Sequence, residues 1–390
     1  MDSHDELGLN TRLAHFGEDE KLKGAVAPPI FQTSLFVFDS YDNFVSGIVD
    51  KPEGPPFHYS RIGNPSVDLA ERKIADLEGT ETCKLFGTGQ GAITAAIMSC
   101  VKSGAHVVAV DTCYGPTRYL LTEYLSRFGV KVTFVSGLDT SEIFDAVTPE
   151  TSLIYLESPS SVVFRLQDVE AVTKFAREKG IATAIDNTYC TPVFSNPARM
   201  GVDMVLHSGT KFFGGHSDLT AGALCTSRSR METLLREEVN LLGSILAPFP
   251  AWLLTRGLRT LGIRMQRHQS TGNTVASWLA SQSYHSEIFH VGLPDFPQRD
   301  LFLKQMRGST SLFSFVPKNQ DQAAIMRFVE GLKLFQLGVS WGGYESLAVP
   351  LQFKPDNWPE ARWIVRFFCG LEEPEDLIAD MKQSFEKSGL

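Results

Sequence analysis

Two stretches of this sequence place a carboxylate and an amine directly after apolar segments. Asp186 ends one apolar run, and Lys211 follows the next, preceded by hydroxyls at Ser208 and Thr210. A lysine amine can form a Schiff base with an aldehyde, and a carboxylate can keep a pyridine nitrogen protonated so that the ring accepts electrons. Taken alone, such a lysine is usually a solvated charge and such an aspartate a helix cap. Together they predict a pyridoxal 5'-phosphate site, with Ser208 and Thr210 on the phosphate.

A glycine-rich turn lies upstream of these residues. Gly87-Thr88-Gly89-Gln90-Gly91-Ala92 has the form G-x-G-x-x-A, between an apolar run and a helical pattern, and Asp111 follows about 20 residues on. This context fits a dinucleotide-binding fingerprint, so an NAD-dependent oxidoreductase is one alternative, and a plain tight turn is another. Because bare N–H groups at a helix start bind any phosphate, we expect the Gly89 and Gln90 backbone to bind the cofactor phosphate.

Composition and charge restrict the class of protein. The chain has 390 residues, of which 43% are hydrophobic and 21% charged, as in globular proteins of two domains. Its 36 basic and 45 acidic residues give a formal net charge of -9, so we expect neither a nucleic-acid nor a membrane partner. The six cysteines form no C-x-x-C pair, which argues against a metal site or a disulfide framework. The acidic N-terminus does not resemble a secretory leader, and we expect a cytoplasmic protein.

Residues 65–230 alternate short β-branched segments with longer segments of helical period. This spacing predicts βαβ units and a largely parallel sheet, with ligands beyond the carboxyl ends of the strands. The expected strands are Cys83–Phe86, His106–Asp111, Lys131–Ser136, Ser152–Glu157, Ile181–Asp186, Asp203–His207 and Gly222–Thr226. The expected helices include Ser66–Glu78, Gly91–Lys102, Thr117–Phe128 and Asp168–Lys179.

The segments on either side have a different character. Residues 27–64 are rich in Pro, Gly and aromatic residues, and they predict an extended arm that reaches a neighbouring subunit. Helices at Met231–Leu246 and Trp252–Leu279 and strands at Leu312–Val316 and Ile364–Phe368 indicate a smaller α+β domain. We therefore expect an N-terminal arm at 1–62, a cofactor-binding domain at 63–256 and a C-terminal domain at 257–390.

Longer motifs surround the candidate residues. They are Tyr59-Ser60-Arg61-Ile62-Gly63-Asn64-Pro65, Glu157-Ser158-Pro159-Ser160-Ser161, Asp186-Asn187-Thr188, the Lys211 segment, Thr255-Arg256-Gly257-Leu258-Arg259-Thr260-Leu261, Ser340-Trp341-Gly342-Gly343-Tyr344-Glu345-Ser346-Leu347 and Arg366-Phe367-Phe368-Cys369-Gly370-Leu371-Glu372. With these motifs the chain, from about Thr11 to its C-terminus, resembles the Cys/Met-metabolism pyridoxal-phosphate enzymes, which include cystathionine β-lyase, γ-synthase and γ-lyase and methionine γ-lyase.

The resemblance implies a fold and roles for the cofactor residues. The fold would be pyridoxal-phosphate fold type I, aspartate-aminotransferase-like, with a mostly parallel seven-stranded sheet between helices and a smaller α+β C-terminal domain. Lys211 would form the Schiff base and take the α-proton, Asp186 would contact the pyridine nitrogen, and Tyr114 would stack on the ring. Without the resemblance, Tyr114 is equally well explained as a core tyrosine in a turn. Lys211 or Tyr114 would protonate the leaving sulfur.

The resemblance also implies substrate contacts and an assembly. Arg366 would bind the substrate carboxylate, a task that suits a guanidinium, and Ser340, Trp341 and Tyr59 would line the substrate site. Tyr59 and Arg61 would reach the cofactor phosphate of the adjacent subunit, because the family builds its sites across a dimer within a homotetramer.

Within the family the chain is most similar to bacterial cystathionine β-lyase. Trp341 is the tryptophan of those lyases, and Val339 stands where γ-lyases often have an acid. The expected activity is therefore β-elimination of L-cystathionine, or a related cysteine thioether, to homocysteine or another thiol, pyruvate and ammonia, as in methionine biosynthesis and transsulfuration. Cystathionine γ-synthase or γ-lyase activity is the alternative.

Three departures leave the thioether open. Tyr119, beside Arg118, stands where bacterial β-lyases have an acid for the distal amino group. The segments Gly87–Gln90 and Ala247–Leu253 also differ from the β-lyase pattern, and the second is more similar to γ-synthases and γ-lyases. A distal pocket of this kind fits another cysteine thioether as well as cystathionine.

Overall fold

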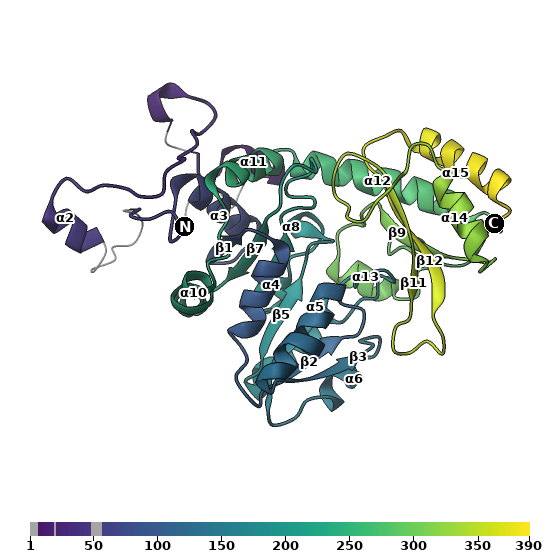
Figure 1. The fold of residues 1–390 in the computed structure, drawn as a ribbon, viewed down its shortest axis with the longest axis horizontal. Coiled ribbons are helices and arrows are strands. Elements are labelled where there is room, and N and C mark those ends of the chain that lie inside the picture. Colours follow the sequence, from purple (N-terminus) through teal and green to yellow (C-terminus); the bar gives the residue numbers. More distant parts are fainter. Residues whose placement is uncertain (1–6, 19–20, 48–56) are drawn as a thin grey trace.

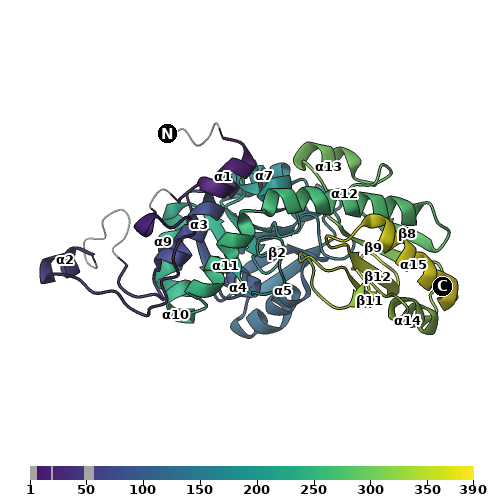
Figure 2. The ribbon, with the colours of Figure 1, turned by 90° about the horizontal axis from the view of Figure 1, so that it is seen from above.

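The computed structural model describes residues 7–18, 21–47 and 57–390. An N-terminal arm projects away from a body that contains two sheets, and a long helix, α12 (Leu261–Ala280), runs from the first sheet toward the second (Figures 1 and 2). Parts of the expected arm at 1–62, namely residues 1–6, 19–20 and 48–56, lie outside the described residues.

The first sheet has seven strands in the order β1-β7-β6-β5-β4-β2-β3. The four neighbouring pairs from β6 to β3 are parallel, whereas β7 is antiparallel to both of its neighbours. This confirms the α/β class with a mostly parallel sheet, and each expected strand is found within one residue of its predicted ends. The strands are β1 (Thr82–Phe86), β2 (His106–Val110), β3 (Lys131–Val135), β4 (Thr151–Glu157), β5 (Ala182–Asp186), β6 (Met204–Ser208) and β7 (Gly222–Thr226).

Helices cover the sheet, and their ends follow local sequence signals. Helix α3 (Pro65–Glu78) begins after Asn64, whose side chain accepts from the Ser66 N–H, and ends at Gly79 with a left-handed φ of 74°. The other helical segments of this domain are α4 (Gly89–Met98), α5 (Gly115–Tyr119), η3 (Leu120–Tyr124), η4 (Leu125–Phe128), α6 (Thr140–Asp145), α7 (Val169–Lys179), α8 (Thr191–Phe194) and η5 (Pro197–Met200).

Four predicted helices are wrong in their extent. The helix expected at Gly91–Lys102 is α4, which begins at Gly89 and ends at Met98, and the one expected at Thr117–Phe128 is divided into α5, η3 and η4. The helix expected at Trp252–Leu279 is two helices, α11 (Pro248–Leu258) and α12, and at the junction the Gly257 carbonyl accepts from the Thr260 N–H and the Arg264 guanidinium. The helix expected at Met231–Leu246 is α9 (Arg228–Leu234), η6 (Leu235–Val239) and α10 (Asn240–Leu242). It stops at Gly243, whose φ of 67° is easily adopted only by glycine.

The second sheet has five strands in the order β10-β11-β12-β9-β8. Only β9 and β12 were expected. β11 carries Pro350, which weakens a strand pattern, and β8 is short and partly exposed. The strands are β8 (His285–Phe289), β9 (Leu312–Pro317), β10 (Gln336–Leu337), β11 (Leu347–Phe353) and β12 (Arg362–Phe368), packed with α14 (Gln322–Glu330) and α15 (Pro374–Ser388). Helix α13 (Arg299–Gln305) instead places Phe302 in the core of the first sheet.

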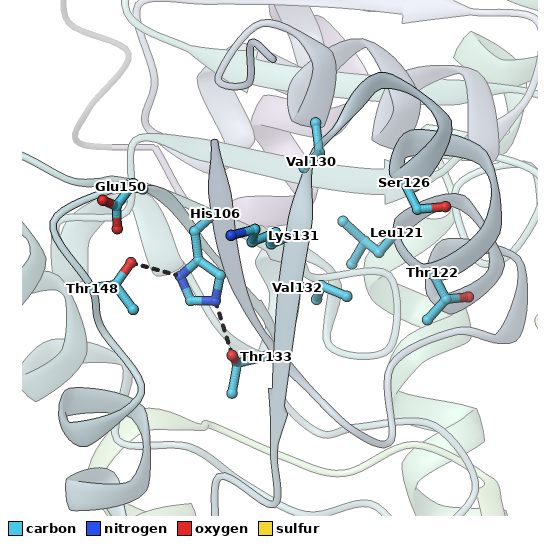
Figure 3. A pocket seen from close by; sticks show the side chains of 10 residues that line it. All are labelled: His106, Leu121, Thr122, Ser126, Val130, Lys131, Val132, Thr133, Thr148 and Glu150. Carbon is cyan, nitrogen blue, oxygen red and sulfur yellow. Dashed lines mark hydrogen bonds between the residues drawn. The ribbon is translucent and has the colours of Figure 1, made fainter. Parts of the chain in front are cut away.

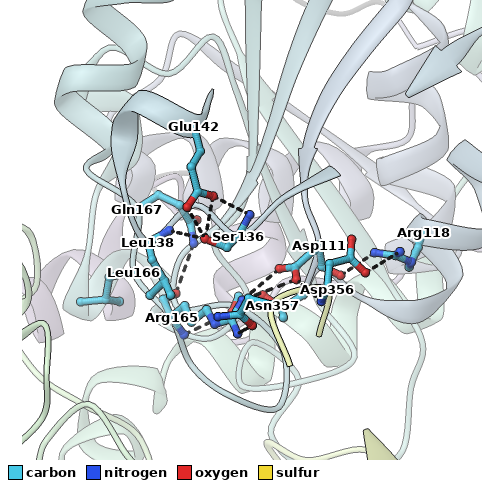
Figure 4. A network of polar contacts seen from close by, with 12 residues as sticks. Asp111, Arg118, Ser136, Leu138, Glu142, Arg165, Leu166, Gln167, Asp356 and Asn357 are labelled. Atoms are coloured by element: carbon cyan, nitrogen blue, oxygen red, sulfur yellow. Dashed lines mark hydrogen bonds and ion pairs between the residues drawn. The ribbon is translucent and has the colours of Figure 1, made fainter. Parts of the chain in front are cut away.

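A polar network joins the two parts of the body (Figure 4). The Asp111 carboxylate, just after β2, accepts from the backbone N–H of Asp356 at 2.8 Å and pairs with Arg165 at 3.2 Å. Arg165 also donates to Asn357, and Arg118 donates to the Asp111 carbonyl and pairs with Asp356. The loop between β11 and β12 is thereby held against the strand ends of the first sheet.

The described part of the arm is largely irregular. It contains α1 (Leu9–His15), η1 (Leu22–Gly24), α2 (Tyr41–Val45) and a single bridge between Leu35 and Tyr59. Val26 and Val37 are 80% and 86% exposed, so the arm presents apolar side chains to its surroundings. None of the helices in the described segments combines the length and the hydropathy that a bilayer span needs.

Candidate active site

Lys211 lies in the turn after β6, at the carboxyl edge of the sheet. Its Nζ donates to the Ser340 hydroxyl, and it lies 5.5 Å from the centre of the Trp341 ring. Burial lowers the pKa of Lys211 to about 8, with a further contribution from the positive charge of Arg366, and Asp186 opposes the shift. A neutral lysine amine is therefore available near physiological pH, as a nucleophile or general base requires.

Asp186 is the buried last residue of β5. Its Oδ1 accepts from the Thr188 hydroxyl at 2.5 Å and from the Thr188 N–H at 2.9 Å. The Thr188 hydroxyl in turn accepts from the Ser208 N–H at 2.8 Å, so one side chain ties the ends of β5 and β6 together. Burial raises the pKa of Asp186, and the bonds from Thr188 oppose the rise. Thr188 belongs to a motif noted in the sequence but had been given no role there.

The glycine turn forms a cradle beside Ser208. Gly89 starts α4, and a Cβ at this position would lie 2.8 Å from the Ser208 Cβ, so only glycine lets the helix start approach the strand end so closely. The Gln90 side-chain Oε1 is buried and has no hydrogen-bond partner among the described residues. Thr210 is close in sequence, but its hydroxyl donates to the Ala221 carbonyl and accepts from the Ala221 N–H. The backbone of Gly89 and the Ser208 hydroxyl are thus the groups best placed for a phosphate.

Tyr114 is held through its backbone. Its N–H donates to Glu157 Oε2 at 2.8 Å, and Glu157 Oε1 accepts from the Ser161 hydroxyl at 2.6 Å, while the Tyr114 side chain remains 47% exposed. Burial, together with the neighbouring Asp186 carboxylate, raises the pKa of Glu157 to about 8. Glu157 was not among the predicted site residues, although a carboxylate at the end of a buried strand is a signal that could have singled it out.

Arg366 is positioned by β12 on the other side of Lys211. One Nη donates to the Ser340 carbonyl at 3.2 Å, and Arg366 forms no ion pair with any carboxylate of the described segments. Burial lowers its pKa to about 10, which leaves the guanidinium charged at neutral pH. Ser340 itself has a left-handed φ of 88°, which is a strained conformation. Its hydroxyl accepts from Lys211 and its carbonyl accepts from Arg366. This arrangement leaves a cation available for a substrate carboxylate.

Tyr59 and Arg61 lie apart from this group. Arg61 donates to the Asn240 carbonyl at 2.7 Å and its guanidinium lies 5.6 Å from the Tyr59 ring centre. No described hydrogen bond or ring contact joins either residue to Lys211 or Asp186 of the same chain. Tyr59 is 44% exposed, so both residues are accessible to another molecule.

The expected distal residues point elsewhere. Arg118, besides its bonds to Asp111 and Asp356, lies 4.0 Å from the centre of the Phe134 ring, and Tyr119 is 66% exposed. Val339, at 78% exposure, presents an apolar side chain beside Ser340. These residues supply no carboxylate for a distal amino group.

A hollow of about 540 Å³ at the opposite edge of the sheet contains none of these residues (Figure 3). His106, the first residue of β2, lines it and is bonded to the hydroxyls of Thr151 and Thr133 at 2.7 and 2.9 Å. Because the strands begin here, the hollow is remote from the carboxyl edge that carries Lys211.

Comparisons with known proteins agree with this geometry. Residues 10–386 match the family model of the Cys/Met metabolism PLP-dependent enzymes, and the chain belongs to that family. It is 38% identical to an L-methionine gamma-lyase of Porphyromonas gingivalis over 97% of each chain, and 36% identical to one of Pseudomonas putida over 98% of each. It is 32% identical to a putative cystathionine beta-lyase of Rhizobium johnstonii, over 97% of this chain and 96% of the relative.

The family's cofactor, pyridoxal 5'-phosphate, fits the residues present. The glycine cradle at Gly89 suits the phosphate, the buried Asp186 carboxylate suits a protonated ring nitrogen, and the Lys211 amine suits the aldehyde. The prediction of this cofactor from the sequence is therefore confirmed, whereas the role of each residue remains a proposal.

Proposed function

We propose that this chain is a carbon–sulfur β-lyase that cleaves L-cystathionine or a related cysteine thioether into a thiol, pyruvate and ammonia. The observation that carries the proposal is Lys211, whose amine has a pKa of about 8 and lies between Ser340, Trp341 and the unpaired cation of Arg366. One amine beside one carboxylate-binding cation is what proton removal from the Cα of an amino acid needs.

Pyridoxal phosphate, when bound, withdraws electrons from the Cα of an amino acid and so weakens its Cα–H bond. Arg366 binds the substrate carboxylate and fixes which Cα bond faces Lys211. Lys211 takes the α-proton, and the pair of electrons released expels the sulfur from Cβ. Lys211 or Tyr114 returns a proton to the sulfur, and water then converts the remaining three-carbon fragment to pyruvate and ammonia. Asp186, fixed by Thr188, keeps a negative charge at the ring nitrogen.

The proposal that sulfur leaves from Cβ, and not from Cγ, is based on the residues beside Lys211. The Trp341 ring packs on Phe212, with ring centres 5.4 Å apart, and restricts the space next to the amine, while Val339 adds an apolar side chain. A compact apolar wall favours a short thioether arm held close to Lys211. Arg118, Tyr119 and Val339, the residues assigned to the distal pocket from the sequence, carry no carboxylate, so an uncharged thioether fits as well as cystathionine.

A γ-lyase acting on L-methionine is the second candidate. Two of the relatives named above are L-methionine gamma-lyases with 36–38% identity across nearly the whole chain. Such an enzyme shares the cofactor residues and differs in the carbon from which sulfur leaves, so the release of 2-oxobutyrate in place of pyruvate separates the two.

The finer structural predictions belong to the same proposal. The mostly parallel seven-stranded sheet with a smaller second sheet supports fold type I. The division into an arm at 1–62, a cofactor domain at 63–256 and a C-terminal domain at 257–390 is part of the proposal, with the second boundary near the end of α11. Exposed Tyr59 and Arg61, together with the apolar arm, support a dimer in which these residues complete the neighbour's phosphate site, within a cytoplasmic homotetramer.

The test is to supply the holoenzyme separately with L-cystathionine, S-methyl-L-cysteine and L-methionine and to identify the keto acid by mass spectrometry. Pyruvate from the first two supports the proposal. 2-Oxobutyrate from methionine at a higher kcat/KM supports the γ-lyase, and the absence of any keto acid from the three substrates overturns both.

A further inference from the structure

A buried cluster of polar and ionisable side chains lies immediately behind the cofactor residues. His207, in β6, approaches Glu78, the last residue of α3, with 2.6 Å between Nε2 and Oε1. The side-chain amide of Asn187 donates to the same Glu78 oxygen at 2.9 Å and to the Ser195 carbonyl at 3.1 Å. The three residues are at most 2% exposed, so the sheet and α3 remove them from solvent.

The cluster is incompletely satisfied. Glu78 Oε2, His207 Nδ1 and Asn187 Oδ1 are all buried without a hydrogen-bond partner among the described residues. A buried pair of ionisable side chains contributes little net stability compared with apolar residues of the same volume, although removing one partner is costly. A contribution to folding stability therefore does not explain the presence of the cluster of Glu78, Asn187 and His207.

The position of the cluster gives a better reason. Asn187 directly follows Asp186, and His207 directly precedes Ser208. Asp186 pairs in register with Leu206, so the alternation of side chains places His207 on the other face of the sheet from Asp186. The His207 ring also packs on Phe213, two residues after Lys211, with 4.6 Å between ring centres.

We propose that Glu78 and His207, bridged by Asn187, form a positioning pair that fixes the ends of β5 and β6 and thereby the spacing of Asp186 from Ser208. The two residues touch neither substrate nor cofactor. They act through the backbone on the ring contact of Asp186 and on the phosphate contact of Ser208. The charge of His207 also contributes to lowering the pKa of Asp186, against the effect of burial. The inference requires the cofactor site described above, but it does not depend on which thioether is cleaved.

The experiment measures binding of pyridoxal phosphate to the apoprotein by fluorescence titration, together with the thermal midpoint of the apoprotein. The variants are Glu78→Gln, His207→Asn and the double variant. The control is His106→Asn, which removes another buried histidine with two hydrogen bonds at the opposite edge of the sheet.

Each single variant should weaken cofactor binding about 10-fold or more, the range seen for residues that orient the ligands of a bound group. The double variant should be no weaker than the worse single variant, because one unit is lost in each case. His106→Asn should lower the thermal midpoint and leave the dissociation constant within about twofold. A purely structural role would make the control and the two variants behave alike, and that result overturns the proposal.

Asn187→Ala provides a second test if Glu78→Gln and His207→Asn do not fold. It removes the bridge without stranding a charge, and it should weaken cofactor binding by about threefold, a loss smaller than that of the charge variants. Unchanged binding in folded Asn187→Ala would contradict the proposal. The expected pattern of weakened cofactor binding in the variants, together with no keto acid released by the wild-type holoenzyme, would count against the proposed function and leave the positioning proposal standing.

Discussion

Glu157 and Asp186 are register partners across β4 and β5, so two buried carboxylates lie side by side at the carboxyl edge of the sheet. Two like charges in such a place do not both ionise easily, and the pKa of Glu157 rises to about 8 through burial and the Asp186 charge. The two carboxyl groups therefore titrate as a coupled pair, and protonation of Glu157 relieves the repulsion between them. Glu157 holds the backbone of Tyr114 by accepting a hydrogen bond from its N–H.

Replacing Glu157 separates its hydrogen bonds from its charge. Glu157→Gln keeps an oxygen for the Tyr114 N–H and replaces the oxygen that accepts from the Ser161 hydroxyl with an amide that donates to that hydroxyl, so cofactor affinity and kcat should stay within about threefold of the wild type. Glu157→Ala releases Tyr114 and should weaken cofactor binding about 10-fold. Titration of both apoproteins with pyridoxal phosphate tests this, and equal losses in the two variants would show that the charge of Glu157 matters.

The lowered pKa of Lys211 predicts how fast the apoprotein takes up its cofactor. Only the neutral amine attacks an aldehyde, so the rate of incorporation should rise with pH and level off above about 8. Stopped-flow absorbance over a pH series gives the midpoint. A midpoint near the ordinary lysine value of about 10.4 would mean that Lys211 is not desolvated as described.

Arg366 should govern substrate binding. Loss of a charge-assisted pair to a carboxylate costs about 2–5 kcal/mol, so Arg366→Leu should raise KM by about 30-fold or more. Arg366→Lys retains a charge without the bidentate geometry, so its KM should lie between those of the wild type and of Arg366→Leu. Steady-state kinetics of the two variants test this, and an unchanged KM in Arg366→Leu would show that another residue binds the substrate carboxylate.

In the apoprotein, Arg366→Leu should also raise the pKa of Lys211, since the positive charge of Arg366 lowers that pKa.

His290 should contribute to acid lability. It is fully buried, its Nε2 lies 2.9 Å from the Thr310 carbonyl, and burial lowers its pKa to about 4. Because this value is below that of an unfolded histidine, about 6.5, the unfolded state gains protons first, and stability is lost as the pH falls from about 6.5 to about 4. His290→Gln should show a smaller drop of the thermal midpoint across that window. Parallel curves for the two proteins would refute the assignment.

The sequence predicted the first sheet well for a physical reason. Strands buried on both faces are continuous apolar runs, and they stand out against polar turns wherever they occur. The second sheet was largely missed because β11 contains a proline and β8 is partly exposed. At the break between α11 and α12 the Gly257 carbonyl accepts from the Arg264 guanidinium, a contact that no periodicity reveals.

The candidate site divides in a similar way. Lys211, Asp186 and Ser208 could be predicted because they follow strands whose ends converge in a parallel sheet. Thr188 and Glu157 could not be given their roles, because these depend on neighbours in other strands. The role proposed for His207 depends on Glu78, which only the structure places beside it.

The central claim is that Lys211 is the residue that carries the cofactor and moves the α-proton. The most direct test is to reduce the holoenzyme with sodium borohydride, digest it and locate the phosphopyridoxyl group by mass spectrometry, with Lys211→Ala in parallel. The account predicts the label on Lys211 in the wild type, and neither label nor keto-acid release in the variant. A label on another lysine such as Lys84, or turnover by Lys211→Ala, would contradict it.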